Sequence, residues 1–313
     1  MSVEVEFCLL AERGVLEQQA VLLCESIRYF CGRYASAPIT VISPRPERRP
    51  ESWSQQRFVD LNASYLELSL ASPVPDYGPS FRVLALAWRA RQNGPPILIQ
   101  LDSDTLFFAE PDLLQLEGHA AAARPVDMVG MCSRGPGDSR EDLWRAMCAV
   151  NDVALDTLST VHTTIGGHAV RASYNGGLIV AERGIYPLVE ECFRNILAAD
   201  LRPFSGANTG LRTGTGIVPP SGWEWWGTSQ AAISIALAKM QRPLRILHPG
   251  YNVPLHLFDE LDAPAEPIVH VHYHWLCTDP GEPNPMFDTR LPLTGGHREW
   301  LRERLPLAHF PRQ

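Results

Sequence analysis

A short apolar run over residues 97–101 (ILIQL) constrains most strongly what this chain can fold into. Near-continuous apolarity over five residues is typical of a parallel strand that helices cover on both faces. Other strand signals alternate along the chain with apolar residues at helical spacing, as in residues 16–30. This alternation of strands and helices predicts an α/β fold.

Hydrophobic periodicity and the positions of Gly and Pro predict where the main elements lie. Helices are expected over residues 16–30, 79–92, 185–199 and 228–240. Strands are expected over residues 3–10, 38–42, 97–101, 128–131, 176–181, 245–247 and 268–274, with a weaker strand signal near 57–61. A last short helix is expected after the Pro-rich residues 279–292.

Composition excludes several classes of function. The chain has 27 Lys and Arg residues against 35 Asp and Glu residues, a formal charge of −8, which argues against a nucleic-acid partner. Lys239 is the only lysine and no Gly-Lys-Ser/Thr triplet occurs, so a P-loop is excluded. No apolar run approaches the roughly 20 residues of a transmembrane helix, and residues 1–10 lack a basic leader, so we expect a cytoplasmic protein without a transmembrane segment.

Two acids directly follow the central apolar run. Asp102 and Asp104 flank Ser103, and residues two apart in an extended segment point to the same side. In open α/β sheets ligands bind beyond the carboxyl ends of the strands, and carboxylate oxygens suit Mg²⁺ or Mn²⁺ carrying a diphosphate. The alternative is that the two acids only cap the turn before Pro111.

Four segments carry a resemblance to a known family: Arg82 before the strand, residues 99–105 with Asp-x-Asp, residues 174–180 (YNGGLIV), and a late His-bearing strand. In this order, over residues 3–275, they resemble metal-dependent nucleotide-sugar glycosyltransferases of the GT-A fold. The resemblance is closest to retaining family 8, which includes glycogenin and bacterial lipopolysaccharide galactosyltransferases. It implies a Rossmann-like, mostly parallel central sheet flanked by helices.

The resemblance also implies an organisation and an activity. Residues 1–275 would form one catalytic domain, with a nucleotide-binding half (1–104) and an acceptor-binding half (105–275), before a Pro-rich tail with a short helix (276–313). The enzyme would transfer a sugar, as a hexosyltransferase, from a nucleoside-diphosphate donor, with a UDP-sugar favoured. The hydroxyl acceptor would be a glycan, a lipid-linked compound or a small molecule, and the sequence leaves its identity and the oligomeric state open.

By position in the family pattern, the resemblance implies roles for individual residues. Mn²⁺ or Mg²⁺ would be bound by Asp102, Asp104 and His270, and the donor by Arg82, Asp102, Ser103, Asn175, Gly176 and Gly177. The chain departs from the family after its late histidine, because His274 and Trp275 stand there without the usual Lys-Pro-Trp. Either His272 or His274 replaces that phosphate clamp, or the chain belongs to a neighbouring GT-A family of different stereochemistry.

A tryptophan-rich segment precedes the helix expected at 228–240. Aromatic faces pack against sugar rings, so an acceptor platform is expected from Trp223, Trp225 and Trp226, with a core role as the alternative for at least one of them. Residues 222–230 loosely resemble the family's acid-Gln segment, so a retaining enzyme would use Gln230 or a backbone carbonyl near the anomeric carbon. An inverting enzyme would use Glu224 as general base.

A different class of enzyme also fits the late histidines. His270, His272 and His274 alternate, so on one strand they would share a face, and such a pair or triplet can bind zinc. The alternative function is therefore a zinc-dependent hydrolase. That alternative leaves the Asp-x-Asp segment unexplained.

Overall fold

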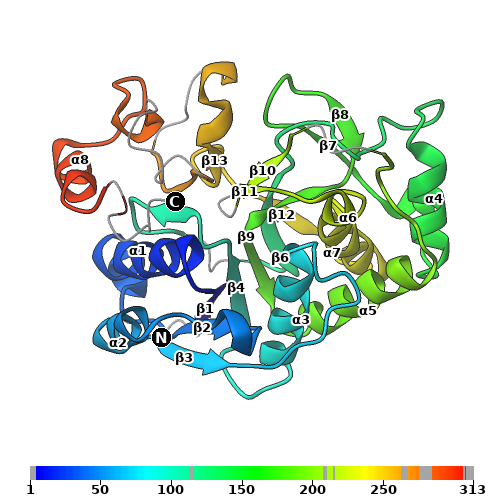
Figure 1. The fold of residues 1–313 in the computed structure, drawn as a ribbon. Helices are drawn as coiled ribbons and strands as arrows, with labels where there is room; N and C mark the ends of the chain where they lie inside the picture. Colours follow the sequence, from blue (N-terminus) through cyan, green and yellow to red (C-terminus); the bar gives the residue numbers. More distant parts are fainter. Residues whose placement is uncertain are drawn as a thin grey trace.

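A seven-stranded sheet crosses the centre of the computed structural model, which describes residues 5–112, 116–206, 210–213, 216–261, 267–274, 284–305 and 307 (Figure 1). The strand order is β12-β6-β9-β4-β1-β2-β3. Only β9 runs antiparallel to its neighbours in this sheet. The strands are β1 (Val5–Leu10), β2 (Ile39–Ser43), β3 (Ser64–Glu67), β4 (Ile97–Leu101), β6 (Ala121–Pro125), β9 (Tyr174–Glu182) and β12 (Leu244–Ile246). The predicted α/β class and its mostly parallel central sheet are confirmed.

Helices cover both faces of this sheet and bury separate hydrophobic cores. Strand β1 shows the division, because Phe7 and Leu9 enter one core and Cys8 enters the other. The first core includes α1 (Val15–Phe30) and α2 (Ser52–Asp60). The second includes α3 (Pro79–Ala90), α4 (Glu141–Ala149), α5 (Ile185–Ala198) and α7 (Thr228–Lys239).

A second, three-stranded sheet continues from the end of β4 and positions the late histidines. It contains β5 (Thr105–Phe107), β13 (Val253–Pro254) and β14 (His270–His272). Strand β14 pairs antiparallel with β5, with His272 opposite Thr105. Because β5 begins directly after Asp104, this register brings Asp104 and His272, 168 positions apart in the chain, close together.

The remaining elements are short. Two hairpins pair β7 (Thr160–His162) with β8 (Ala169–Arg171) and β10 (Arg212–Thr213) with β11 (Gly216–Ile217). The short helices are α6 (Pro220–Trp223) and α8 (Gly295–Arg302). In the C-terminal part, Trp300 and Leu301 of α8 are buried in a cluster with Leu22 and Phe108. No described helix combines the length and apolarity that crossing a membrane requires.

Two of the strand predictions are wrong. The strand expected at 128–131 lies earlier, at β6, because the Ala-rich residues 121–123 are buried between β9 and β12 although alanine has little intrinsic strand preference. The weak strand signal near 57–61 belongs to α2, whose buried Ser54 and Phe58 lie at helical spacing.

A buried charged network ties β1 to β2, to α3 and to the segment just before α5. The fully buried carboxylate of Glu6 accepts hydrogen bonds from Thr40 Oγ1 (2.6 Å), Arg89 Nε (2.7 Å) and Arg183 (2.5 Å). Removal of one member of such a network leaves the others buried and without a counter-charge.

We expect Glu6→Ala to lower the free energy of unfolding by about 3–5 kcal/mol, because two largely buried guanidinium groups lose their carboxylate. Urea denaturation followed by circular dichroism measures this loss. The control is Lys239→Ala, which breaks a solvent-accessible pair with Glu191 and is expected to change stability by less than about 1 kcal/mol. Equal losses of unfolding free energy in the two variants would show that the buried Glu6 network contributes no more to stability than the exposed Lys239 pair.

Candidate metal and donor site

The turn after β4, residues 102–104, is held from two sides. The backbone N–H of Asp102 donates to the Gly177 carbonyl of β9 (3.0 Å), and the N–H of Tyr273 donates to the Asp104 carbonyl (3.0 Å). The two acids therefore occupy the junction between the central sheet and the three-stranded sheet, at the carboxyl end of a parallel strand. This is the edge at which open α/β sheets bind ligands.

Asp104, His272 and His274 form a cluster that can hold a metal ion. His272 Nε2 lies 3.3 Å from Asp104 Oδ1, and His274 Nδ1 lies 3.3 Å from Asp104 Oδ2. One ligand atom from each residue lies within 4.8 Å of the others. Imidazole nitrogens with a carboxylate oxygen are a donor set for Mn²⁺ or Zn²⁺. His274 reaches the cluster by a different route from the predicted strand alternation. It follows the end of β14 and adopts a left-handed backbone conformation with φ 52°.

The charges of the cluster are interdependent. Burial lowers the pKa of His272, but the carboxylates of Asp104 and Asp102 outweigh it and raise that pKa above its ordinary value. Burial raises the pKa of Asp104, yet His272 and His274 hold it well below its usual range. The pKa of His274 is lowered by burial and by the charge of His272. The site therefore keeps an ionised carboxylate beside imidazoles, which favours cation binding.

Asp102 pairs with a different partner. Its carboxylate forms an ion pair with Arg82 of α3, and Asp102 Oδ2 lies 4.0 Å from His272 Nε2. The Arg82 side chain is largely buried, and Gly176 makes room for it, because a Cβ at Gly176 would lie 2.5 Å from the guanidinium. Arg82, Asp102 and Gly176, which the resemblance assigned to the donor site, thus lie together in the structure.

His270 and Ser103 lie apart from this cluster. The His270 ring is fully buried with its centroid 4.6 Å from that of Phe107, and burial lowers its pKa well below the ordinary value. Ser103 is buried and its hydroxyl donates to the Leu10 carbonyl of β1 (2.5 Å). The three histidines therefore do not converge on one point: the cluster contains His272 and His274.

Two polar residues near the cluster, a buried asparagine and a half-buried histidine, were missed by the sequence analysis. Asn252 is 1% exposed, and neither atom of its side-chain amide has a hydrogen-bond partner among the described residues. His256 packs its ring perpendicular to that of His274, with centroids 4.1 Å apart, and burial lowers its pKa to about 2. Both come from the segment around β13, which has no local motif, so only the tertiary structure reveals them.

Gly177 allows the backbone of β9 to approach His272. A Cβ on Gly177 would lie 2.6 Å from both His272 Nδ1 and Asn252 Oδ1. Contacts this short require a shift of one of the groups, and both neighbours are buried.

We expect Gly177→Ala to weaken Mn²⁺ binding about tenfold or more, because the methyl group displaces the His272 ring from Asp104. Isothermal titration calorimetry with Mn²⁺ measures the affinity. The matched control is Gly184→Ala, where a Cβ would meet no atom within 4 Å and φ is −64°. An unchanged affinity in Gly177→Ala would show that the close approach is unimportant.

A third acid, Asp127, follows β6 near the same edge. Its Oδ2 accepts a hydrogen bond from Asn175 Nδ2 (2.6 Å). Burial raises the pKa of Asp127 to about 6, against the opposing charges of His272 and Arg124 and hydrogen bonds from Asn175 and Thr164. The sequence analysis missed Asp127 because it expected the strand at residues 128–131, whereas β6 ends at Pro125. With the strand in its observed place, Asp127 shows the same signal that identified Asp102: an acid just after a central strand.

Asp127 should make stability depend on pH in the metal-free protein. Its folded pKa lies above the unfolded value near 4, so the folded state loses stability as pH rises from about 4 to about 6. Above pH 6 the full cost of ionising Asp127 in the folded state is present. A pKa shift of about two units corresponds to about 3 kcal/mol of unfolding free energy at most. We expect Asp127→Asn to match the parent at pH 4 and to be more stable at pH 7.5, measured by urea denaturation in EDTA. Equal stability at pH 7.5 would contradict this.

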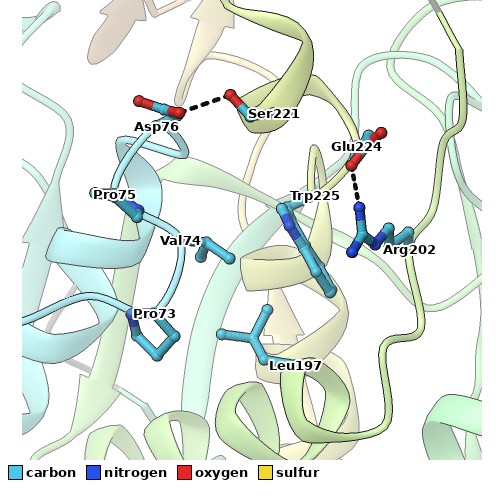
Figure 2. Close-up of a pocket in the computed structure, with 9 residues that line it drawn as sticks. All are labelled: Pro73, Val74, Pro75, Asp76, Leu197, Arg202, Ser221, Glu224 and Trp225. Atoms are coloured by element: carbon cyan, nitrogen blue, oxygen red, sulfur yellow. Dashed lines mark hydrogen bonds and ion pairs between the residues drawn. The ribbon is translucent and has the colours of Figure 1, made fainter.

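Two of the expected residues, one acceptor tryptophan and the candidate base, line a separate cavity. Trp225 and Glu224 line a cavity of about 330 Å³ together with Val74, Leu197 and Arg202 (Figure 2). Glu224 forms an ion pair with Arg202.

The other two tryptophans contact different partners. Trp223 stacks on Phe204 with ring centroids 4.1 Å apart, and Trp226 packs edge-to-face on Tyr77 with centroids 6.0 Å apart. Gln230 lies in the first turn of α7, where its N–H donates to the Gly227 carbonyl (3.0 Å). Of the three tryptophans, Trp225 thus lines the cavity and Trp223 and Trp226 do not.

Comparison with known proteins establishes the family. The geometry defines an α/β protein with a candidate metal cluster at the carboxyl edge of its parallel sheet. Residues 7–203, more than half of the chain, match the family described as the Rhodobacterales glycosyltransferase domain, so the chain belongs to this family and is a glycosyltransferase. The predicted activity class is confirmed, and the observed sheet agrees with the predicted GT-A fold.

Other comparisons are more distant. The crystal structure of core-mannan synthase A from Aspergillus fumigatus, in an Mn/GDP form, aligns with a TM-score of 0.47 and 8% identity. The alignment covers 78% of this chain and 72% of that one. No curated protein matches the sequence.

Proposed function

We propose that this glycosyltransferase takes its sugar from a nucleoside-diphosphate donor in a metal-dependent reaction that retains anomeric configuration, as in family 8. A UDP-sugar is the favoured donor. The observation that carries the proposal is the Asp104, His272 and His274 cluster beside the partly buried Arg82–Asp102 pair. A cation site next to a buried guanidinium provides the positive charge that a diphosphate requires.

Each residue of this site would have a separate task. Asp104, His272 and His274 would hold Mn²⁺ or Mg²⁺, with His270 replaced as ligand because its ring packs on Phe107. A bound divalent ion supplies Lewis-acid stabilisation of the departing diphosphate. Arg82, fixed by Asp102, would face the phosphates or the donor sugar.

The acceptor would approach through the cavity lined by Trp225. An aromatic face beside charged groups suits a hydroxyl compound such as a sugar. Retention is favoured over inversion because Glu224, the candidate base, is already paired with Arg202 and would have to leave that partner to accept a proton. In the retaining mechanism Gln230 would assist near the anomeric carbon.

A thermal-shift panel of UDP, GDP, dTDP and CDP, each with and without Mn²⁺, tests the donor assignment. Ligand binding to the folded state raises the melting temperature, and we expect a shift with UDP that requires Mn²⁺. Asp104→Ala should abolish that shift and sugar transfer while leaving the fold intact. The control Asp156→Ala changes an acid that is 93% exposed and should behave like the parent.

Two outcomes would contradict the proposal. Full transfer activity in Asp104→Ala would remove the metal-site assignment. Stoichiometric, tightly bound zinc in the purified protein, without any nucleotide shift, would favour the zinc-hydrolase alternative, with Asp104 completing the ligand set of His272 and His274.

A further inference from the structure

A relay of hydrogen bonds crosses three strands beside the site. Asp127 Oδ2, after β6, accepts from Asn175 Nδ2 of β9 (2.6 Å). Asn175 Oδ1 in turn accepts from the backbone N–H of Gly177 (2.9 Å). The Gly177 carbonyl accepts from the N–H of Asp102 at the end of β4 (3.0 Å). The relay therefore ends on one of the two acids of the Asp-x-Asp segment.

The relay bonds to Gly177, in a segment that has no side chains to pack; the neighbouring Gly176 carbonyl accepts from Gln100 Nε2 (2.7 Å). Gly176 and Gly177 have no side chains, and glycine backbone has more conformational freedom than that of any other residue. Both glycines are in close approach to the site: the Cβ position of Gly176 lies 2.5 Å from Arg82, and that of Gly177 lies 2.6 Å from His272. A small displacement of this part of β9 would move both groups.

Both the oxygen and the nitrogen of the Asn175 side-chain amide therefore form hydrogen bonds within the protein. Its oxygen accepts from Gly177, and its nitrogen donates to Asp127. Asp127 is a half-buried acid with a buried Oδ1, and this desolvation raises its pKa and makes its ionisation unfavourable for the fold. A neutral apolar residue there would avoid this cost but would leave the Asn175 amide without its acceptor.

We propose that Asp127 and Asn175 are positioning residues of the donor site, which hold the two glycines of β9 in place under Arg82 and His272. The consequence for transfer rests on the proposed function, whereas the relay itself does not. Neither residue belongs to the metal cluster, and both act through the backbone of Gly177.

The test compares Asp127→Ala, Asn175→Ala, the double variant and Asp127→Asn by two measurements. Calorimetry gives the Mn²⁺ affinity, and NMR hydrogen exchange gives the protection of the Gly177 amide. We expect each alanine variant to weaken Mn²⁺ binding about tenfold and to speed exchange at Gly177, and the double variant to be no worse than either single one. Asp127→Asn should stay within about twofold, because its amide oxygen accepts the same hydrogen bond.

Several outcomes would overturn the proposal. Additive effects in the double variant would show that Asp127 does not act through Asn175, and unchanged Gly177 exchange in both alanine variants would show that no relay operates. If Asp127→Ala does not fold, the relay is tested by Mn²⁺ affinity and Gly177 exchange in Asn175→Ala and Asp127→Asn. Failure of the proposed function gives a different result. A protein that binds no nucleotide can still show faster Gly177 exchange in the alanine variants. If the protein binds no Mn²⁺, Gly177 exchange alone tests the relay.

Discussion

The partial burial of two carboxylates at the end of β4 is the constraint on which the rest of the site depends. An acid removed from water must be paired or neutralised, and the chain supplies a different partner for each. Asp102 has the guanidinium of Arg82 from α3, and Asp104 has the imidazoles of His272 and His274. The helix before the strand and the late strand β14 are thereby fixed at the same edge of the sheet, where a ligand can enter.

The arrangement divides the positive charge of the site between a permanent and an exchangeable source. Arg82 is always protonated and is held by Asp102. The cluster around Asp104 gains its positive charge from protonated imidazole or from a bound cation, and metal binding and protonation compete for the same nitrogens. Two of its three members, His272 and His274, lie beyond residues 7–203, so the part of the chain outside the family match completes the site.

Close approach of backbone to side chains is the second requirement of the site. Strand β9 is the one antiparallel strand of the central sheet and passes directly beside β4. Its glycines leave space for Arg82 and His272, and its Asn175 replaces the packing that the glycines lack with hydrogen bonds. The glycines that leave space for Arg82 and His272 thus need hydrogen bonds from neighbouring side chains to keep the backbone of β9 in place.

Local sequence determined several of the main elements and the first half of the site. The apolar run of β4, the helical spacing of α1, α3 and α5, and the acids after β4 are local patterns, and the structure reproduces them. Only the tertiary structure decided which histidines join Asp104, because the choice depends on the register of β14 against β5 and on a left-handed turn at His274. It also decided the places of Asp127 and Asn252, since burial and long-range pairing leave no periodic signal in the chain.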